Sequence, residues 1–404
     1  MTSGTYDAEN LKWQEKARNV AEKVVRPLAR KYDELQEYPW EIKDALAAEG
    51  LLSVWIPKEY GGAGGGVANL CIVVEELSRA CPGVGVLFAV NALGSFPIII
   101  SGTEEQKNKY LPKIAAGETL MSFCLSEKEA GSDAGSLRVR GVPQTDGTWK
   151  IFGEKKWTTN GSAANLFTVF AVTDPEKGSR GISAFLVDKN DPGFSIAKVE
   201  DKMGIRCVPV VETRFDGVTV GQDRLLGGKT GLGFKHAMQT LDKARPGVAA
   251  QGVGCAQGAM EYALRYTTQR IQFGEPVSSK QMVQGILADM AMQVEAARQL
   301  VLAAARSLDA GDPKGSKLAA MAKCFATDVA MKVSVDAVQL FGGYGFMRDY
   351  PIEKYMRDAK ITQIYEGTNQ VQRMVIARNM INEANNFAFL DAFIPKESQW
   401  KYEG

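Results

Sequence analysis

The sequence is poor in the side chains that most often build metal centres and nucleophilic active sites. It has one histidine, His236, and its cysteines are far apart, with no CxxC pair. The six cysteines are Cys71, Cys81, Cys124, Cys207, Cys255 and Cys324. Zinc centres and Cys/His nucleophiles need such residues in clusters, so we expect no metal and no thiol catalysis. Free thiols are typical of a reducing compartment.

An excess of charge of one sign is also lacking. The 48 basic residues nearly cancel the 47 acidic ones. Nucleic-acid binding draws much of its affinity from clustered Lys and Arg, so no nucleic-acid partner is expected. No apolar run is expected to approach the ~20 residues of a membrane span, and MTSGTYDAEN is too polar for a signal peptide. We therefore predict no membrane association and a bacterial cytoplasmic location, or the mitochondrial matrix if a transit peptide has been removed.

What the sequence does contain is a change in residue pattern along its 404 residues. Helical periodicity runs from about 5 to 118, with helices expected at 40–51, 67–79 and 104–115. Alternating, β-branched runs such as NLFTVFAVT and GISAFLVD follow up to about 228. Long helices are then expected at 234–270, 280–309, 315–341 and 368–385, lengths typical of a helical bundle.

These residue patterns predict an α+β multidomain fold. The expected parts are an N-terminal α-helical domain (1–120), a middle antiparallel β domain (121–229) and a C-terminal four-helix bundle (230–385). The last part, 386–404, is a tail that runs without clear period and could pack on a neighbour.

Two segments of the β region have residues suited to holding a planar or phosphorylated group. In AGSDAGS (130–136), small residues favour a tight turn whose backbone N–H groups can approach a phosphate or a ring. Taken alone, such a stretch is more often an ordinary hairpin turn. Further on, Trp157 and Thr159 share one face of a strand before an Asn-Gly turn. Taken alone, Trp157 is more typical of a core residue.

Glu366 is the candidate for acid–base chemistry. It stands between Tyr365 and Gly367, directly before Thr368, which can N-cap a following helix. Most glutamates are solvated surface charges. A carboxylate in apolar surroundings instead has a raised pKa and can act as a base near neutral pH, which is what carbon-acid chemistry needs.

Eight motifs in a fixed order decide between these alternatives. They are PKEYGGAG (57–64), CLSEKEAGSD (124–133), KKWTTNG (155–161), KMGIR (202–206), LDKARP (241–246), QRIQFGEP (269–276), LFGGYGF (340–346) and IYEGTNQ (364–370). In this order and spacing, the sequence resembles the acyl-CoA dehydrogenase family from about residue 6 to 385. The family's order of a helical domain, a β domain and a four-helix bundle matches the order predicted above from the residue patterns.

The resemblance implies one FAD per subunit of a homotetramer, with the ADP half of the FAD reaching a neighbouring subunit. The positions implied on the flavin side are Phe123, Leu125, Ser126, Gly131, Ser132, Trp157, Thr158 and Thr159. Those implied for the pyrophosphate and adenosine are Arg270, Gln272, Phe273, Lys280, Gln281, Gln339, Gly342, Gly343, Thr368 and Gln370.

The resemblance also implies an acyl-CoA substrate. The implied substrate positions are Ser132, Phe234, Asp242, Arg245, Tyr365, Gly367 and Arg378. For Asp242 and Arg245 the alternative is an i,i+3 pair on a helix surface, worth a few tenths of a kcal/mol.

The implied reaction is α,β-dehydrogenation of an acyl-CoA thioester to trans-2-enoyl-CoA, as in β-oxidation. Glu366 takes the α-proton, the β-hydrogen leaves as hydride to N5 of FAD, and an electron-transfer flavoprotein accepts the electrons. The thioester carbonyl is polarised by a ribityl hydroxyl and by the backbone N–H of Glu366. One subgroup of the family places its base at the position of Ala244, and an alanine cannot serve.

Some alternatives stay open. An enoyl-CoA reductase would use the same base and flavin. An acyl-CoA oxidase reducing O₂ is commonly longer, and a scaffold without flavin would not need Glu366 or Arg270. Lys128 and Glu129 stand where many relatives have Pro-Gly, close to the expected thioester entrance. The acyl group depends on the helices near 80–100 and 234–245.

Overall fold

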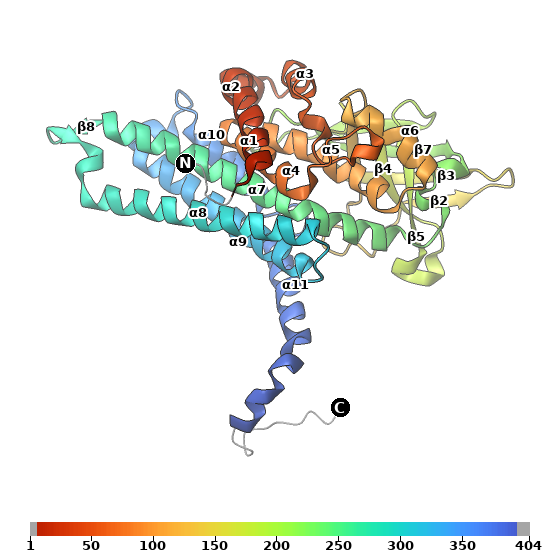
Figure 1. The fold of residues 1–404 in the computed structure, drawn as a ribbon. Coiled ribbons are helices and arrows are strands. Elements are labelled where there is room, and N and C mark those ends of the chain that lie inside the picture. The colour runs from red at the N-terminus through yellow and green to blue at the C-terminus, as the bar shows by residue number, and fades with distance from the viewer. Residues whose placement is uncertain (1–5, 394–404) are drawn as a thin grey trace.

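The computed structural model describes residues 6–393, so residues 394–404 of the predicted tail lie outside it. Helices, then a sheet, then helices follow one another along the chain (Figure 1), which confirms the predicted fold class. The N-terminal helices are α1 (Ala8–Val20), α2 (Arg26–Leu35), α3 (Trp40–Ala48), α4 (Gly66–Ala80), α5 (Pro82–Ser101) and α6 (Glu104–Ala115).

The starts of these helices follow from local sequence and from one long-range contact. Asp7 and Thr103 form capping boxes with Asn10 and Gln106, which satisfy the free N–H groups at the starts of α1 and α6. The start of α4 is instead capped by Asp309, which accepts the N–H groups of Val67 and Ala68 at 2.7 and 2.9 Å. This carboxylate comes from the C-terminal bundle, so it ties the two helical parts together.

Helix α5 corrects the expectation that no apolar run approaches membrane length. Its 20 residues have a mean hydropathy of 2.0 in their most apolar window, long and apolar enough to cross a bilayer by composition alone. However, 78% of that window is buried inside the protein. A helix that is hydrophobic on all sides is also what the core of a large protein contains, and α5 lies between α4, α7 and the sheet.

The middle region is one seven-stranded sheet. Its strands are β1 (Met121–Cys124), β2 (Arg140–Pro143), β3 (Trp149–Thr159), β4 (Leu166–Val172), β5 (Ile182–Asp188), β6 (Phe194–Val199) and β7 (Val210–Val220), in the order β1-β4-β2-β3-β7-β6 with β5 beside β4. Most pairs are antiparallel, but β1 runs parallel to β4 and β2 meets β4 in parallel at one position, so the sheet is mixed.

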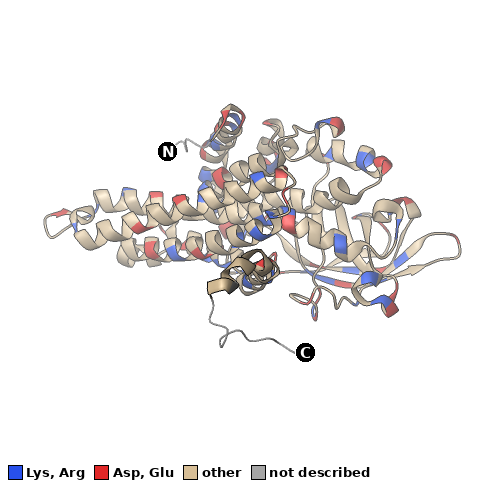
Figure 2. Ribbon diagram, turned by 60° about the horizontal axis from the view of Figure 1, so that its bottom comes forward, with Lys and Arg blue, Asp and Glu red and all other residues tan. Residues whose placement is uncertain are grey.

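The C-terminal helices form the long bundle. They are α7 (Gly233–Gln269), α8 (Gln281–Asp309), α9 (Gly315–Phe341), α10 (Ile352–Thr362) and α11 (Asn369–Asn382), with the hairpin β8 (Ile271–Gln272) and β9 (Glu275–Pro276) between α7 and α8. Helices α7, α8 and α9 run side by side, and acidic and basic residues are interspersed along them (Figure 2).

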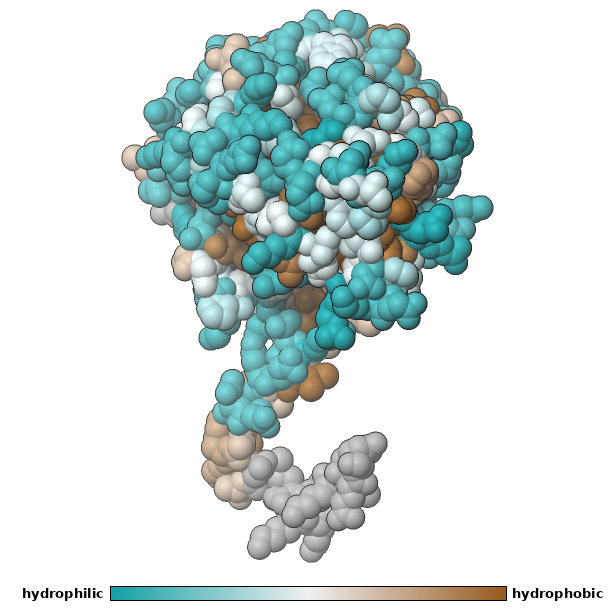
Figure 3. Space-filling model, turned by 90° about the vertical axis from the view of Figure 1, so that its right-hand side faces the viewer, coloured by the Kyte–Doolittle hydropathy of each residue, from teal (hydrophilic) through white to brown (hydrophobic). Residues whose placement is uncertain are grey.

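The end of the described chain leaves the body of the molecule. Helix α11 and the following 3₁₀ segment η9 (Ala384–Phe393) project as an arm from the bundle (Figures 1 and 3). Within the single chain this arm exposes large apolar side chains, among them Ile381 at 72% and Phe393 at 81%. Such exposed apolar surface on one segment is typical of an interaction site.

Candidate active site

Glu366 lies in the short link between α10 and α11. Its backbone φ is +53° and that of Gly367 is +85°, so two successive left-handed residues turn the chain sharply. A left-handed φ is uncommon outside glycine. The turn ends at Thr368, whose hydroxyl accepts the N–H of Val371 at 3.2 Å and caps α11, which confirms the predicted cap.

The Glu366 residue is half-buried, and one oxygen of its carboxyl group is enclosed by protein. Its Oε2 is buried and has no hydrogen-bond partner among residues 6–393. Burial raises the pKa of Glu366 to about 7, against the lowering effect of the positive charges on Lys323 and Arg245. A carboxyl group with such a pKa is available as a proton acceptor at neutral pH.

Arg245 and Asp242 do form an ion pair, three residues apart on α7. The pair is not an ordinary surface pair, because Arg245 is only 6% exposed and its Nε is buried without a partner among the described residues. The Asp242 side chain remains 34% exposed. Arg245 therefore has a donor left over beside the Glu366 site, which an ordinary surface pair would not have.

Tyr365 ties the turn that carries Glu366 to the helices around it. Its hydroxyl donates to Oε1 of Gln251 on α7, and the Gln251 amide donates to the carbonyl of Pro82 at 3.0 Å, at the start of α5. The base, the bundle and the N-terminal helices are thus joined by one chain of hydrogen bonds. Gln251 is a residue that the sequence did not single out.

A buried ion pair fixes the first predicted flavin segment. Nζ of Lys155 donates to the carbonyl of Leu125 at 2.8 Å and to Glu127 at 2.7 Å. Glu127 also accepts the N–H groups of Arg138 and Val139, at 2.6 and 3.1 Å. Burial lowers the pKa of Lys155 to about 8, against the attraction of Glu127. Leu125 and Ser126 are therefore held in place by this ion pair. Phe123, in β1, packs at a tilt against Phe170, with ring centroids 5.0 Å apart.

The second predicted flavin segment contains a β-bulge. The register of β3 against β7 shifts between Lys155 and Thr158, and Trp157 has a φ of +55°. Bulges re-aim side chains, and Trp157 is 55% exposed, so it is not the core residue that its type suggests. Thr158 is fully buried with its hydroxyl 3.6 Å from the thiol of Cys124, whereas Thr159 is half-buried.

The AGSD turn lies beside the start of α7. Gly131 and Ser132 are exposed, as are Lys128 and Glu129 before them. A Cβ at Gly135 would lie 4.0 Å from the ring of Phe234. The structure therefore brings the predicted substrate residues Ser132 and Phe234 into one neighbourhood.

The remaining predicted cofactor positions form a second group, which we call the tip cluster. It lies where α7, α8 and α9 end, and the Arg270 guanidinium is 5.5 Å from the centre of the Tyr344 ring. Phe273 is 94% exposed, and a Cβ at Gly342 or Gly343 would meet nothing within 4 Å among the described residues. Its members are Arg270, Gln272, Phe273, Lys280, Gln281, Gln339, Gly342 and Gly343.

The tip cluster and Glu366 are far apart within one chain. Arg245 and Arg270 lie 25 residues apart on α7, which at 1.5 Å per residue separates them by roughly 37 Å. Arg378 is also not beside Glu366, because it is exposed on α11, ten residues beyond Thr368, or roughly 15 Å along the helix.

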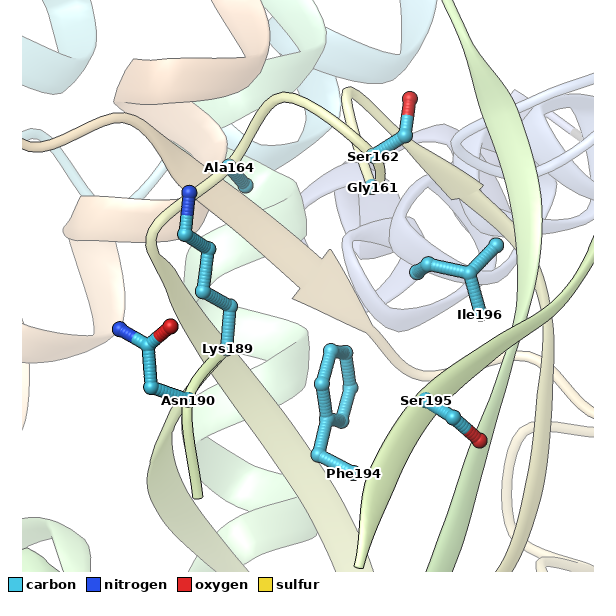
Figure 4. A pocket seen from close by; sticks show the side chains of 8 residues that line it. All are labelled: Gly161, Ser162, Ala164, Lys189, Asn190, Phe194, Ser195 and Ile196. Atoms are coloured by element: carbon cyan, nitrogen blue, oxygen red, sulfur yellow. The ribbon is translucent and has the colours of Figure 1, made fainter. Parts of the chain in front are cut away.

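Two cavities differ in volume and in the residues that line them. One, of about 570 Å³, is lined by the predicted cofactor residues Thr368 and Gln370 together with Lys360 and Arg373. Figure 4 shows the other, of about 220 Å³, between Gly161–Ser162 and β6; it contains none of the predicted site residues. The first cavity adjoins the turn that carries Glu366.

Comparisons with known proteins identify the family of this chain. Three family models match: Acyl-CoA dehydrogenase N-terminal domain at residues 7–118, middle domain at 122–218 and C-terminal domain at 231–381. The chain belongs to the acyl-CoA dehydrogenase family, whose members are flavoprotein oxidoreductases of fatty-acid β-oxidation.

Relatives and solved structures cover nearly the whole chain. "Probable acyl-CoA dehydrogenase fadE25" of Mycobacterium leprae is 49% identical over 90% of this chain and 93% of its own length. Butyryl-CoA dehydrogenase from Megasphaera elsdenii superposes with a TM-score of 0.91 at 41% identity, covering 94% of this chain and 100% of that one. A chain solved in work on the electron transferring flavoprotein of Acidaminococcus fermentans superposes with a TM-score of 0.91 at 44% identity. The match covers 94% of this chain and 99% of that one.

Proposed function

We propose that this enzyme removes the α-proton of an acyl-CoA thioester with Glu366 as the base, giving a trans-2-enoyl-CoA. The observation that carries the proposal is the Glu366 carboxyl group itself. Its Oε2 is buried without a partner among the described residues, and burial raises the pKa of the group to about 7. A solvated glutamate would be too weak a base for a carbon acid.

The residues around Glu366 have distinct tasks in this reaction. The carboxylate accepts the α-proton and is neutral afterwards, a change that its apolar surroundings favour. Polarisation of the thioester carbonyl is assigned to the backbone N–H of Glu366, as the family resemblance implies. Arg245 has a buried, unpartnered Nε, and with Asp242, Ser132 and Phe234 it is proposed to hold the CoA portion.

The residues present fit FAD. The exposed Trp157 offers a ring face beside the rigid segment of Leu125 and Ser126, and Thr368 and Gln370 line a charged cavity next to the base. At the tip cluster, Arg270 supplies positive charge and the two open glycines permit close approach of a phosphate. When bound, FAD supplies a hydride acceptor for the β-hydrogen of the substrate.

We infer that a complete FAD site needs two chains. Thr368 and Gln370 lie with Glu366, whereas Arg270 of the tip cluster lies 19 residues beyond Gln251, the α7 residue that Tyr365 bonds, which is roughly 28 Å along the helix. A homotetramer, as proposed from the family, would supply the tip cluster from a neighbouring copy. The exposed apolar residues of the arm and the tip support contacts between copies.

The substrate and the electron acceptor are proposed from the relatives. The Megasphaera enzyme is named for butyryl-CoA, so a short acyl chain is the first choice. The Acidaminococcus structure concerns an electron transferring flavoprotein, which we propose as the class of acceptor. We also propose a cytoplasmic location, which the bacterial source of the relatives supports.

Mixing the purified holoprotein without oxygen with acyl-CoA thioesters of different length and shape tests the function. The proposal expects loss of flavin absorbance with at least one short-chain thioester, and no loss with free CoA as the control. Peroxide release at a comparable rate in air, without added acceptor, would instead favour an oxidase. A holoprotein that no thioester reduces would contradict the proposed reaction.

A further inference from the structure

Lys323 is a buried cation that the sequence analysis did not single out. It lies on α9, with 0% of the residue exposed. Lysines are almost never fully buried unless they are paired or hydrogen-bonded, because moving an ammonium group out of water is costly. The contacts that Lys323 makes therefore need an explanation.

Those contacts reach the turn that carries Glu366. Nζ of Lys323 donates to the carbonyl of Gly367 and to Oδ1 of Asn369, both at 2.8 Å. Gly367 follows Glu366 and has a φ of +85°, and Asn369 is the first residue of α11. One ammonium group thus bonds to both sides of the cap residue Thr368.

Asn369 completes the connection to α9. Its amide nitrogen donates to Oγ1 of Thr327 at 2.9 Å and to Oδ1 of Asp328 at 2.8 Å, and Asn369 itself is 2% exposed. From the other side, the Gln372 amide donates to the carbonyls of Glu366 and Gly367, each at 3.1 Å. The left-handed turn is held by side chains on both sides.

We propose that Lys323 is a positioning residue for Glu366: from α9, its ammonium group holds the Gly367 carbonyl and the Asn369 side chain and so fixes the turn that aims the carboxylate. The left-handed φ of Glu366, a residue other than glycine, is a strained conformation that persists only when the surroundings determine it. The inference rests on the proposed role of Glu366, and it adds a residue to which neither motif nor comparison assigns a role.

The charge of Lys323 has a second consequence. The charged groups that act on Glu366 are Lys323 from α9 and Arg245 from α7, and both lower its pKa. Burial lowers the pKa of Lys323 itself to about 8, while Glu366, Cys324 and Asp328 raise it and Arg245 lowers it further. Removing the Lys323 charge should therefore raise the pKa of the base, so the reaction would need a higher pH.

Three variants separate anchoring from charge. Lys323→Met removes both, Lys323→Gln keeps a hydrogen-bond donor without the charge, and Lys332→Met is the control on the same helix, where Lys332 is half exposed and pairs with Asp336. Flavin reduction by a thioester is measured against pH, together with KM, flavin content and hydrogen exchange of residues 363–372.

For Lys323→Met, the expected result is a roughly 10- to 100-fold slower reduction, the size of effect that misplacement of a reacting group produces. KM should change little, the acidic limb of the pH profile should move to higher pH, and exchange at 363–372 should accelerate. Lys323→Gln should show the pH shift with a smaller loss of rate. If Lys323→Met does not fold, Lys323→Gln alone tests whether Lys323 positions Glu366.

An unchanged rate, pH profile and exchange in both variants would overturn the proposal. A variant that only melts at lower temperature but reduces its flavin normally would also overturn it. If wild-type holoprotein is reduced by no thioester, the proposed function fails, and the exchange at 363–372 still decides whether Lys323 holds the turn.

Discussion

At the scale of single residues, the proposed reaction depends on a carboxyl group whose backbone conformation and burial are both unfavourable for stability. Glu366 combines a left-handed φ of +53° with a buried oxygen that has no partner among the described residues. Both features cost stability. Function explains the arrangement, because the same burial makes the carboxylate a stronger base.

This cost predicts a pH-dependent effect of Glu366→Gln on stability. The pKa of Glu366 is raised from 4.5 to about 7 on folding, so the folded protein holds this proton more tightly than the unfolded chain does. Stability from this group is therefore lost as pH rises through that window, and glutamine removes the loss. The melting temperature of the variant minus that of wild type should increase between about pH 5 and about pH 8. A difference that does not change with pH would mean that the pKa of Glu366 is not raised.

The sequence could predict Glu366 and its cap Thr368, because the motif that contains them is local. It could not predict the contacts of Lys323 with this turn. Lys323 lies 43 positions before Glu366, and its sequence context does not distinguish it from a surface lysine on a helix. Nor could it predict that Arg245 is buried, since the pairing with Asp242 fits a surface helix equally. Burial of a charged side chain is decided by tertiary packing, which spacing alone does not contain.

At the scale of elements, the sequence predicted α7, α8 and α9 to within one residue, but its last helix, 368–385, runs three residues past the end of α11. It missed α10, although Ile352, Tyr355 and Ala359 are buried at helical spacing, because glycines and Pro351 precede them. It gave the helix near 80–100 no exact bounds, since α5 is apolar on all sides and contains Pro97. The bulge at Trp157 also escaped it, because alternation predicts a regular strand.

The contact between α4 and α7 gives a prediction about helix packing. A Cβ at Gly254 would lie 2.2 Å from the carbonyl oxygen of Glu75, so the two helices touch through glycine. Gly254→Ala should destabilise the protein by about 1–3 kcal/mol through overpacking. Gly247→Ala is the control, since a Cβ there meets nothing within 4 Å among the described residues; it should stabilise the helix by up to about 1 kcal/mol. Denaturant unfolding of both variants checks this, and equal effects would contradict the close contact.

At the scale of the whole molecule, the separation between Glu366 and the tip cluster is the main consequence of the fold. It divides the predicted site residues into two separate groups. Under the proposed function, two chains would supply one FAD site, and assembly would be part of the active site.

A mixing experiment tests this division of the site. Arg270→Ala should lose FAD more readily than wild type, while Arg265→Ala, an exposed arginine on the same helix, should not. Co-expression of Arg270→Ala with Glu366→Gln should restore activity, because about a quarter of randomly mixed sites then combine an intact base with an intact tip from the other chain. Activity no greater than the sum of the two separate variants would place both groups of residues in one chain.

The most direct test of the account is the reductive half-reaction of Glu366→Gln. Glutamine has nearly the shape of glutamate but cannot accept the α-proton, so FAD and acyl-CoA should still bind. Mixed without oxygen with the thioester that reduces wild type fastest, the variant should lose its flavin absorbance slower by about 10² to 10⁴ or more. Bleaching at close to the wild-type rate would contradict the assignment of Glu366 as the base.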